Sequence, residues 1–140
     1  MPRFSDRSSA RLAECHPDLQ RLAHEAVKII DFAVIEGYRG EEAQNRAVVE
    51  GKSKLRYPHS KHNRTRDGKP CALAMDLAPW KPGVGIDWND RESFSVMGGV
   101  FLALGQQLGI PVRWGGNWDR DAYFRERGDS WDLPHIELDV

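Results

Sequence analysis

The segment SKHNRTRDGKPCALAMDLAPW, residues 60–80, begins as a polar loop rich in cations and ends as an apolar strand. The strand reads ALAMDLA over residues 72–78, and Asp76 is its one charged member. A charged side chain in such a strand needs solvent, a cation or a metal ion, because burying an unpaired charge is costly. Either Asp76 faces solvent on the same side as Ala74 and Ala78, or it binds a ligand.

Two histidines favour the second interpretation. His62 lies in the loop before Asp76, and His135 lies near the end of the chain in DLPHIEL. Two imidazoles and one carboxylate, with a fourth position left to water, form a catalytic zinc site, and such a site needs a general base close to that water. Asp132 precedes His135 by three residues and is placed to supply the base. Glu137 shares a strand face with His135 and is either a competing base or a group that orients a ligand.

The remaining sequence predicts an α+β domain. Helical spacing of apolar residues and the alternation typical of strands occur without a regular βαβ repeat. The expected elements are helices at 17–30, 40–49 and 91–109, and strands at 31–38, 72–78, 112–114 and the end of the chain. Residues 51–70 are expected to form a long polar loop, and long loops in compact domains are usually functional.

Length and composition limit the classes of protein to consider. A chain of 140 residues predicts one compact domain spanning residues 1–140, with no separate binding domain. A formal net charge of −1 argues against a nucleic-acid partner bound by broad phosphate neutralisation, although residues 52–66 are locally basic. Cys15 and Cys71 are too few for a disulfide scaffold and are expected to be buried thiols. Since neither a signal peptide nor a membrane-spanning run is visible, we expect synthesis in the cytoplasm without membrane insertion.

Three short motifs carry a resemblance to a known family. SKH at 60–62, AMDL at 74–77 and DLPH at 132–135 resemble the SxH, AxD and DxxH motifs of zinc peptidases grouped with the D-alanyl-D-alanine carboxypeptidases. More closely, the chain is similar to bacteriophage endolysins that are L-alanyl-D-glutamate peptidases, and the likeness includes HPDLQRL and DFAVIEGYRGEEAQNRAVVEGKSK upstream. The resemblance implies a single compact domain of the hedgehog and D-alanyl-D-alanine peptidase type, with a small antiparallel sheet flanked by helices.

The resemblance also implies a role for each matching residue. His62, Asp76 and His135 match the zinc ligands of the family. Asp132 matches the base that activates water. Arg39 matches an arginine that stabilises the oxyanion or holds substrate, and a fixed guanidinium suits that task.

Further residues are expected to contact substrate or to shape its site: Ser60, Gln44, Glu137 and Trp114. Trp114 belongs to a group of aromatic residues around the terminal motif, and the alternative for that group is packing in the core. The other members of the group are Trp118, Tyr123 and Trp131. For Arg39 the alternative role is a surface salt bridge with Glu36 or Glu42.

The loop between His62 and Asp76 is longer than in many members of the family. Loops tolerate insertions at small cost, so both ligands can converge if residues 63–71 bulge outward. The insertion adds three cations to the rim of the site: Arg64, Arg66 and Lys69. His59 is expected to lie in the loop or at the rim rather than to bind metal.

The implied function is zinc-dependent hydrolysis of the L-alanyl-D-glutamate bond in peptidoglycan stem peptides. A monomeric endolysin would carry it out after release from the host cytoplasm to the cell wall. One alternative is a D,D- or L,D-carboxypeptidase, in which Arg64 and Arg66 could bind the free C-terminal carboxylate. Another is a non-catalytic, zinc-containing binding module, which the presence of Asp132 argues against. Other divalent ions could replace zinc in this donor set.

Overall fold

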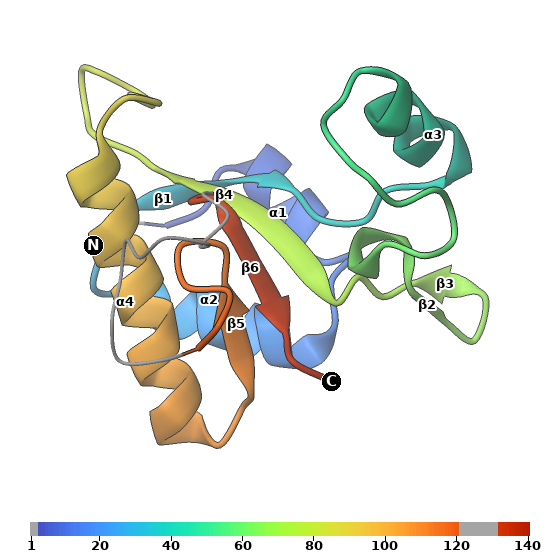
Figure 1. Cartoon of the computed structure of the whole chain (residues 1–140). Coiled ribbons are helices and arrows are strands. Elements are labelled where there is room, and N and C mark those ends of the chain that lie inside the picture. Colours follow the sequence, from blue (N-terminus) through green and yellow to red (C-terminus); the bar gives the residue numbers. More distant parts are fainter. Residues whose placement is uncertain (1–2, 121–131) are drawn as a thin grey trace.

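A four-stranded antiparallel sheet forms the centre of the fold (Figure 1). The structure is a computed structural model that describes residues 3–120 and 132–140. The strand order is β1-β4-β6-β5, with bounds Phe32–Glu36, Ala74–Pro79, His135–Leu138 and Val112–Trp114. The strand from the terminal DLPH motif therefore lies directly beside the strand that carries Asp76.

Helices pack around this sheet. The described part of the chain contains α1 (Asp6–Leu12), α2 (Pro17–Ala26), α3 (Glu41–Val49), the 3-10 helix η1 (Lys61–Asn63) and α4 (Arg91–Leu108). α2 and α4 pack against each other, α4 contacts β4 and β5, and α1 packs on β1. α3, η1 and a small hairpin of β2 (Thr65–Arg66) and β3 (Lys69–Pro70) lie together at one end of the molecule (Figure 1). Within the described ranges, no helix has both the length and the apolar character needed to cross a membrane.

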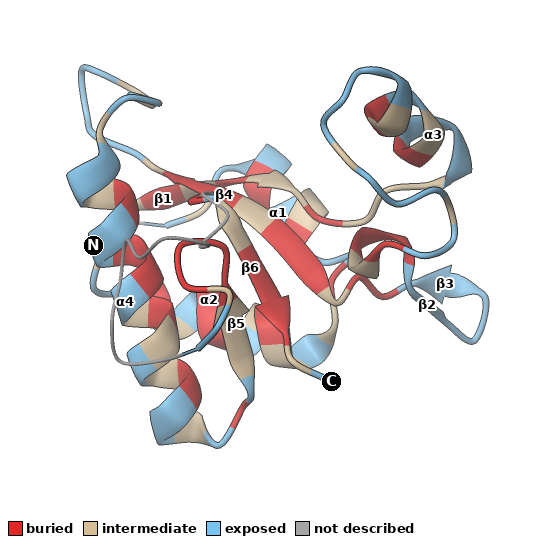
Figure 2. Cartoon of the chain, in the orientation of Figure 1, coloured by how far each residue is buried: buried red, intermediate tan, exposed pale blue. Residues whose placement is uncertain are grey.

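The hydrophobic core lies where α4 and α2 meet the sheet, as the buried residues in Figure 2 show. Phe94, Met97 and Phe101 of α4 are at most 2 % exposed, which confirms the apolar stripe predicted for this helix. The ring of Phe101 meets that of Phe32 edge-on at 5.5 Å between centroids, a favourable aromatic geometry. α4 ends where Gly109 adopts a left-handed conformation with φ of 70°, which costs glycine no steric strain.

Side chains of α1 form hydrogen bonds with the backbone of the edge strand β1. The Ser8 hydroxyl accepts a hydrogen bond from Val34 N–H, and the Arg11 guanidinium donates one to Val34 C=O, both at 3.0 Å. These bonds satisfy backbone groups on the open side of the edge strand. α1 was not predicted, because its sequence DRSSARL carries no apolar stripe.

The α+β class and most of the predicted elements are confirmed, with shifts at their ends. The helix expected at 17–30 ends at Ala26, and residues 27–30 form turns and a bend. The strand expected at 72–78 runs from Ala74 to Pro79. The predicted loop at 51–70 contains η1 and the β2–β3 hairpin, whose two-residue strands are too short to show an alternating pattern.

An irregularity in β1 places an acidic side chain beside Asp76. The register of β1 on β4 shifts between Val34 and Glu36, after which Glu36 lies opposite Asp76. Bulges of this kind re-aim side chains and are frequent near active sites. The register shift therefore places Glu36 beside Asp76, the charged residue of β4.

Candidate metal centre and active site

The sheet places Asp76 and His135 side by side. Asp76 of β4 pairs with His135 of β6, and side chains directly opposite each other on antiparallel strands share one face. η1 contacts β4 and brings His62 to the same place. The three residues expected to bind metal therefore converge, although they are far apart in the sequence.

The donor atoms of these three side chains form a compact cluster. One ligand atom each from His62, Asp76 and His135 lie within 4.8 Å of one another. His62 Nε2 is 3.5 Å from Asp76 Oδ2, and His135 Nδ1 is 3.2 Å from Asp76 Oδ1. Zinc binds histidine and aspartate donors at about 2.0–2.2 Å, so small side-chain shifts would let one ion reach all three. The donor set fits zinc.

The second nitrogen of each histidine ring already has a partner. His62 Nδ1 lies 2.8 Å from the carbonyl oxygen of Gly37, which can only accept a hydrogen bond. His135 Nε2 lies 2.9 Å from Glu137 Oε1, and Glu137 Oε2 accepts a hydrogen bond from Lys61 Nζ at 2.7 Å. Metal-binding histidines commonly donate their other N–H to a carbonyl or a carboxylate. Both rings are thereby oriented with the remaining nitrogen toward the cluster.

Electrostatics keep the cluster suited to a cation. Burial opposes a charged Asp76, but the hydrogen bond from His135 and the nearby His62 and Arg39 outweigh it, so the pKa of Asp76 is lowered. Burial lowers the pKa of His62 and keeps that ring neutral. Burial also disfavours a charged His135, yet its hydrogen bonds with Asp76 and Glu137 raise its pKa to about 9. A divalent cation would replace a proton on His135, because histidine ligands bind metals in the neutral form.

The same contacts define the role of Glu137. Burial opposes its ionisation, but the hydrogen bonds with His135 and Lys61 outweigh burial and lower the pKa of Glu137 to about 2. A carboxylate with so low a pKa is a weak base. The arrangement therefore favours Glu137 as the group that orients His135 over Glu137 as the general base.

Arg39 reaches the cluster from the segment between β1 and α3. Its Nε donates to Glu36 Oε1 at 2.5 Å and its Nη1 to Gln44 Oε1 at 2.9 Å, while Nη2 lies 3.8 Å from Asp76 Oδ2. The salt bridge with Glu36 is therefore present. It is no surface contact for Arg39, because only 12 % of the arginine side chain is exposed and the guanidinium faces the cluster.

Gln44 holds Arg39 in place and does not reach the pocket itself. This side chain is completely buried. Its Oε1 accepts hydrogen bonds from Arg39 Nη1 and from Asn63 Nδ2 at 3.1 Å, and its Nε2 donates to Ser53 Oγ at 3.0 Å and to the carbonyl oxygen of Leu55. All four hydrogen-bonding positions of the amide are used. The predicted substrate contact of Gln44 is therefore replaced by a positioning role.

Asp132 lies on the open side of the cluster. Its side chain is 54 % exposed, and its Oδ2 is 4.0 Å from His135 Nδ1. Partial burial raises the pKa of Asp132, the charge of Asp76 adds to this rise, and His135 and Arg39 oppose it. A carboxylate with a raised pKa is a stronger base at neutral pH.

Gly115 fixes the turn that carries Asp132. Asp132 N–H donates to Gly115 C=O at 3.0 Å, and Gly115 N–H donates to His135 C=O at 2.9 Å. A Cβ atom at Gly115 would lie 1.9 Å from the carbonyl oxygen of Asp132. Only glycine permits this close approach, so Gly115 helps to place both Asp132 and His135.

The cluster lines an open pocket with a volume of about 640 Å³. The predicted site residues that line it are Arg39, Ser60, His62, Asp76, Asp132, His135 and Glu137. Ser60 also caps η1, because its hydroxyl accepts a hydrogen bond from His62 N–H at 3.2 Å. Trp118 forms part of the wall, with its ring 5.3 Å from that of His135.

Trp114 lies in the core rather than in this pocket. It is 3 % exposed, and its Nε1 donates to the carbonyl oxygen of Leu133 at 2.8 Å. Its indole fills the space that a Cβ atom would need at Gly98 and Gly116. A substrate contact by Trp114 therefore finds no support, because tertiary packing covers this side chain. Tyr123 and Trp131 lie outside the described residues.

The insertion between His62 and Asp76 bulges outward, and residues 64–70 are all exposed. Asp67 and Gly68 form the tip of the hairpin with φ of 53° and 77°, the left-handed pair that tight hairpins favour. Arg64 lines the pocket, whereas Arg66 and Lys69 are not part of its described lining. His59 lies at the rim, outside the metal cluster.

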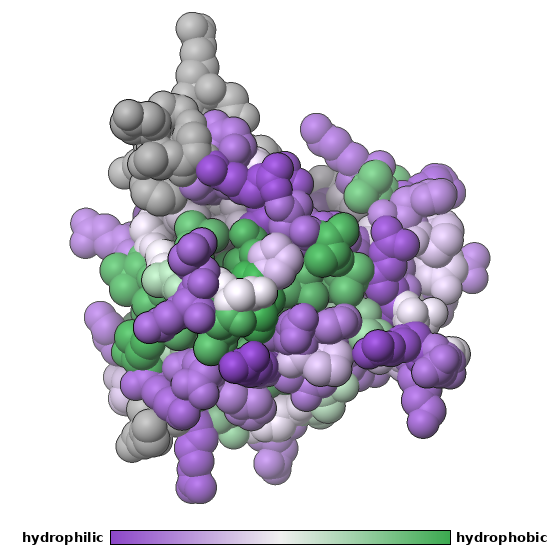
Figure 3. Space-filling view, turned by 90° about the horizontal axis from the view of Figure 1, so that it is seen from below, coloured by the Kyte–Doolittle hydropathy of each residue, from purple (hydrophilic) through white to green (hydrophobic). Residues whose placement is uncertain are grey.

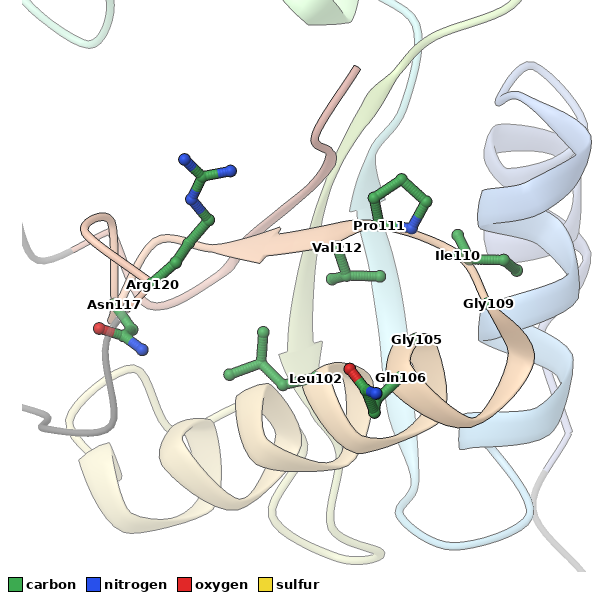
Figure 4. A pocket seen from close by; sticks show the side chains of 9 residues that line it. All are labelled: Leu102, Gly105, Gln106, Gly109, Ile110, Pro111, Val112, Asn117 and Arg120. Atoms are coloured by element: carbon green, nitrogen blue, oxygen red, sulfur yellow. The ribbon is translucent and has the colours of Figure 1, made fainter.

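A second hollow, of about 510 Å³, lies between α4 and β5 (Figure 4). Its described lining includes Leu102, Ile110 and Val112 but no histidine, cysteine, aspartate or glutamate. The described lining of this hollow therefore lacks the imidazole, thiolate and carboxylate donors that bind zinc.

Hydrophobic side chains also gather in the middle of the face seen in Figure 3, where hydrophilic side chains surround them. The pocket with the histidine–aspartate cluster is therefore the candidate active site.

Sequence reasoning missed residues that act through the backbone. Gly37 supplies the carbonyl for His62, and a Cβ atom there would lie 2.7 Å from the carbonyl oxygen of Arg11. Asn63 donates to the carbonyl oxygen of Arg39 at 2.8 Å and completes a capping box with Ser60. The serine and a polar residue three positions later are a recognisable signal for such a cap. A glycine at a strand end indicates close approach only in general terms.

Comparisons with known proteins agree with this geometry. The family model described as phage L-alanyl-D-glutamate peptidase matches residues 1–139. The chain is 32 % identical, over 142 residues, to the L-alanyl-D-glutamate peptidase of Escherichia phage T5, with 97 % of each covered. It is also similar to the crystal structure of the Serratia marcescens L-Ala D-Glu endopeptidase ChiX, with a TM-score of 0.73, 26 % identity and coverage of 96 % of this chain and 88 % of that chain. These matches confirm the predicted fold, and the protein belongs to the phage L-alanyl-D-glutamate peptidase family.

Proposed function

We propose that this protein hydrolyses the L-alanyl-D-glutamate bond in peptidoglycan stem peptides, as a zinc-dependent, monomeric endolysin. The names of its relatives support the choice of bond. The observation that carries the proposal is the cluster of His62, Asp76 and His135 on the wall of an open pocket. A cluster that merely stabilised the fold would not need an open position facing solvent.

The chain supplies what a zinc ion needs. His62 would bind through Nε2 and His135 through Nδ1, because Gly37 and Glu137 occupy the other nitrogens. Asp76 would supply the carboxylate oxygen. Zinc held there would supply Lewis-acid activation of water and of the scissile carbonyl.

Asp132 and Arg39 divide the remaining chemistry. The Asp132 carboxylate accepts a proton from the attacking water and passes it to the amine nitrogen of D-glutamate as the peptide bond breaks. Its exposed position beside His135 and its raised pKa suit both transfers. The Arg39 guanidinium donates hydrogen bonds to the oxyanion that develops on the alanyl carbonyl. Since Glu36 and Gln44 already fix it, Arg39 needs little reorganisation during the reaction.

Digestion of purified sacculi tests this proposal. Mass spectrometry of the products should show new L-alanyl carboxyl ends and new D-glutamyl amino ends. Asp132→Asn should lower the rate about a hundredfold or more while leaving metal content unchanged. Asp67→Asn, at the exposed tip of the hairpin, is the matched control and should retain full activity. Full activity of Asp132→Asn would reject this residue as the base, and products cut elsewhere would reject the proposed bond.

A carboxypeptidase that trims the stem peptide is the second candidate function. The position of Arg64 in the pocket lining favours it, because an arginine there could bind a C-terminal carboxylate. The same digest separates the two activities, because a carboxypeptidase releases single C-terminal amino acids. A protein that binds metal yet produces no new termini would instead be a non-catalytic binding module.

A further inference from the structure

Charge is distributed unevenly around the pocket. The carboxylates in its described lining are Glu36, Asp76, Asp132 and Glu137. Each lies within 4.0 Å of a cationic or imidazole nitrogen near the cluster. The cations Arg39 and Lys61 are likewise committed, to Glu36 and Glu137 respectively. The other cations of the described lining all come from the segment 52–64, which forms one wall.

Two cations on this wall form no ion pair within the described part of the chain. Lys52, Lys54 and Arg64 line the pocket and are exposed. Lys52 pairs with Glu50 at 3.1 Å, whereas Lys54 and Arg64 have no ion pair with any other residue that the structure describes. The wall therefore presents positive charge that no carboxylate among the described residues neutralises through an ion pair.

The backbone that carries these cations is held in place. The N–H groups of Lys52 and Ser53 both donate to the carbonyl oxygen of Ala47, and the Gln44 amide donates to Ser53 Oγ and to the carbonyl oxygen of Leu55. The two residues that flank Lys54, Ser53 and Leu55, are thus both hydrogen-bonded to α3. Arg64 follows η1 directly, and its carbonyl oxygen accepts a hydrogen bond from Cys71 N–H at 2.9 Å. Fixed backbone positions reduce the entropy that binding costs.

The proposed substrate is equally uneven in charge. On one side of the scissile bond, alanine offers a methyl group. On the other side, glutamate has two carboxyl groups, of which chain extension uses one. The second is either a free carboxylate or a carboxamide. A polarised pocket can distinguish these two forms, because only the carboxylate is charged.

We propose that Arg64, assisted by Lys54, binds the free carboxylate of the D-glutamyl residue and so selects peptides in which this group is not amidated. The inference rests on the proposed function and deepens it. A guanidinium can bind a carboxylate through two parallel hydrogen bonds, and Lys54 adds a second positive charge. The substrate therefore lies with its D-glutamyl side toward the 52–64 wall and its alanyl side away from it.

Two peptides that differ only at this group test the inference. One carries a free carboxylate on the D-glutamyl residue and the other a carboxamide. The wild-type protein should cleave the carboxylate peptide with a kcat/KM about tenfold to a hundredfold higher, the worth of a charge-assisted hydrogen bond. In Arg64→Ala this preference should largely disappear, through a lower rate on the carboxylate peptide and an unchanged rate on the carboxamide. Arg66→Ala is the matched control, because Arg66 is an exposed arginine nearby that does not line the pocket.

Binding measurements separate this inference from the proposed function. Calorimetry with Asp132→Asn, which should not cleave, should show tighter binding of the carboxylate peptide and loss of that preference when Arg64→Ala is added. Equal binding or equal cleavage of the two peptides would overturn the inference, and so would an Arg64→Ala variant that loses both activities equally. Tight, selective binding without cleavage of the alanyl–glutamyl bond would instead contradict the proposed function alone.

Discussion

Replacing Gln44 with alanine should remove one of the two side-chain hydrogen bonds that hold the Arg39 guanidinium in place. Gln44 is completely buried and makes hydrogen bonds to four partners. Alanine can make none of them. The donors Arg39 Nη1 and Asn63 Nδ2 and the acceptors on Ser53 and Leu55 would each lose a partner.

The cost follows from which partners water can reach. A buried group left without a hydrogen bond costs about 1–3 kcal/mol. Leu55 is 51 % exposed and Ser53 is half-buried, so water can replace the lost bonds there. Arg39 Nη1 and Asn63 Nδ2 carry the main penalty. We expect a loss of about 3 kcal/mol in the free energy of unfolding, which lowers Tm by about 10 °C for a chain of this size.

Activity should fall for a separate reason. Without Gln44 the guanidinium of Arg39 keeps only its hydrogen bond to Glu36 and can shift relative to Asp76, and a displacement of about 1 Å near a reacting group can cost about a hundredfold in rate. We expect kcat/KM to fall at least about tenfold at a temperature well below the lowered Tm. Metal content should stay unchanged, because Gln44 has no hydrogen bond with a metal ligand.

Three measurements on one preparation check this prediction: thermal unfolding, metal content and peptide cleavage. Glu42→Ala, at an exposed position on the same helix, is the control and should change none of them. A Gln44→Ala protein with a lowered Tm but the wild-type kcat/KM would refute the positioning role. An unchanged Tm would refute the cost assigned to the buried amide.

Three further predictions concern the metal, the core and a thiol. Glu137→Gln removes the carboxylate that orients His135, so metal affinity in a chelator competition should fall about tenfold to a hundredfold; unchanged affinity would contradict that role. Gly98→Ala would place a Cβ atom 2.2 Å from the indole of Trp114 and should destabilise the fold by about 1–3 kcal/mol. Gly99→Ala meets nothing within 4 Å and should stabilise it by up to about 1 kcal/mol, so equal shifts in Tm would be inconsistent with this packing. Burial raises the pKa of Cys15 from 9.0 to about 12; because the unfolded thiol ionises first, the free energy of unfolding should fall as pH rises through this interval. Urea titrations in which Cys15→Ala shows the same decline would exclude the thiol as its cause.

The sequence could predict those features that depend on local pattern or on chemistry. The apolar stripe of α4 is dictated by burial of one helix face, and Phe94, Met97 and Phe101 occupy the core as expected. His135 and Glu137 were placed on one strand face by alternation, and their side chains are hydrogen-bonded. The cluster of His62, Asp76 and His135 could be predicted because the three residues lie in motifs that resemble those of a zinc peptidase family, whereas each residue alone is a weak signal.

Features that depend on tertiary contacts could not be predicted from one sequence. Nothing in the spacing shows that Gln44 points inward at Arg39, or that Trp114 packs on Gly98. α1 is stabilised by bonds from Ser8 and Arg11 to β1 rather than by an apolar face of its own. Such contacts form only when distant segments meet, so local periodicity carries no signal for them.

The proposed activity depends most directly on a single divalent ion shared by His62, Asp76 and His135. Metal analysis by mass spectrometry, paired with sacculus digestion before and after chelator treatment, measures this. We predict about one zinc ion per chain, loss of cleavage when the chelator removes it and recovery when zinc is returned. Asp76→Ala should bind little metal and cleave nothing. Full cleavage by metal-free protein, or a wild-type zinc content in Asp76→Ala, would contradict the account.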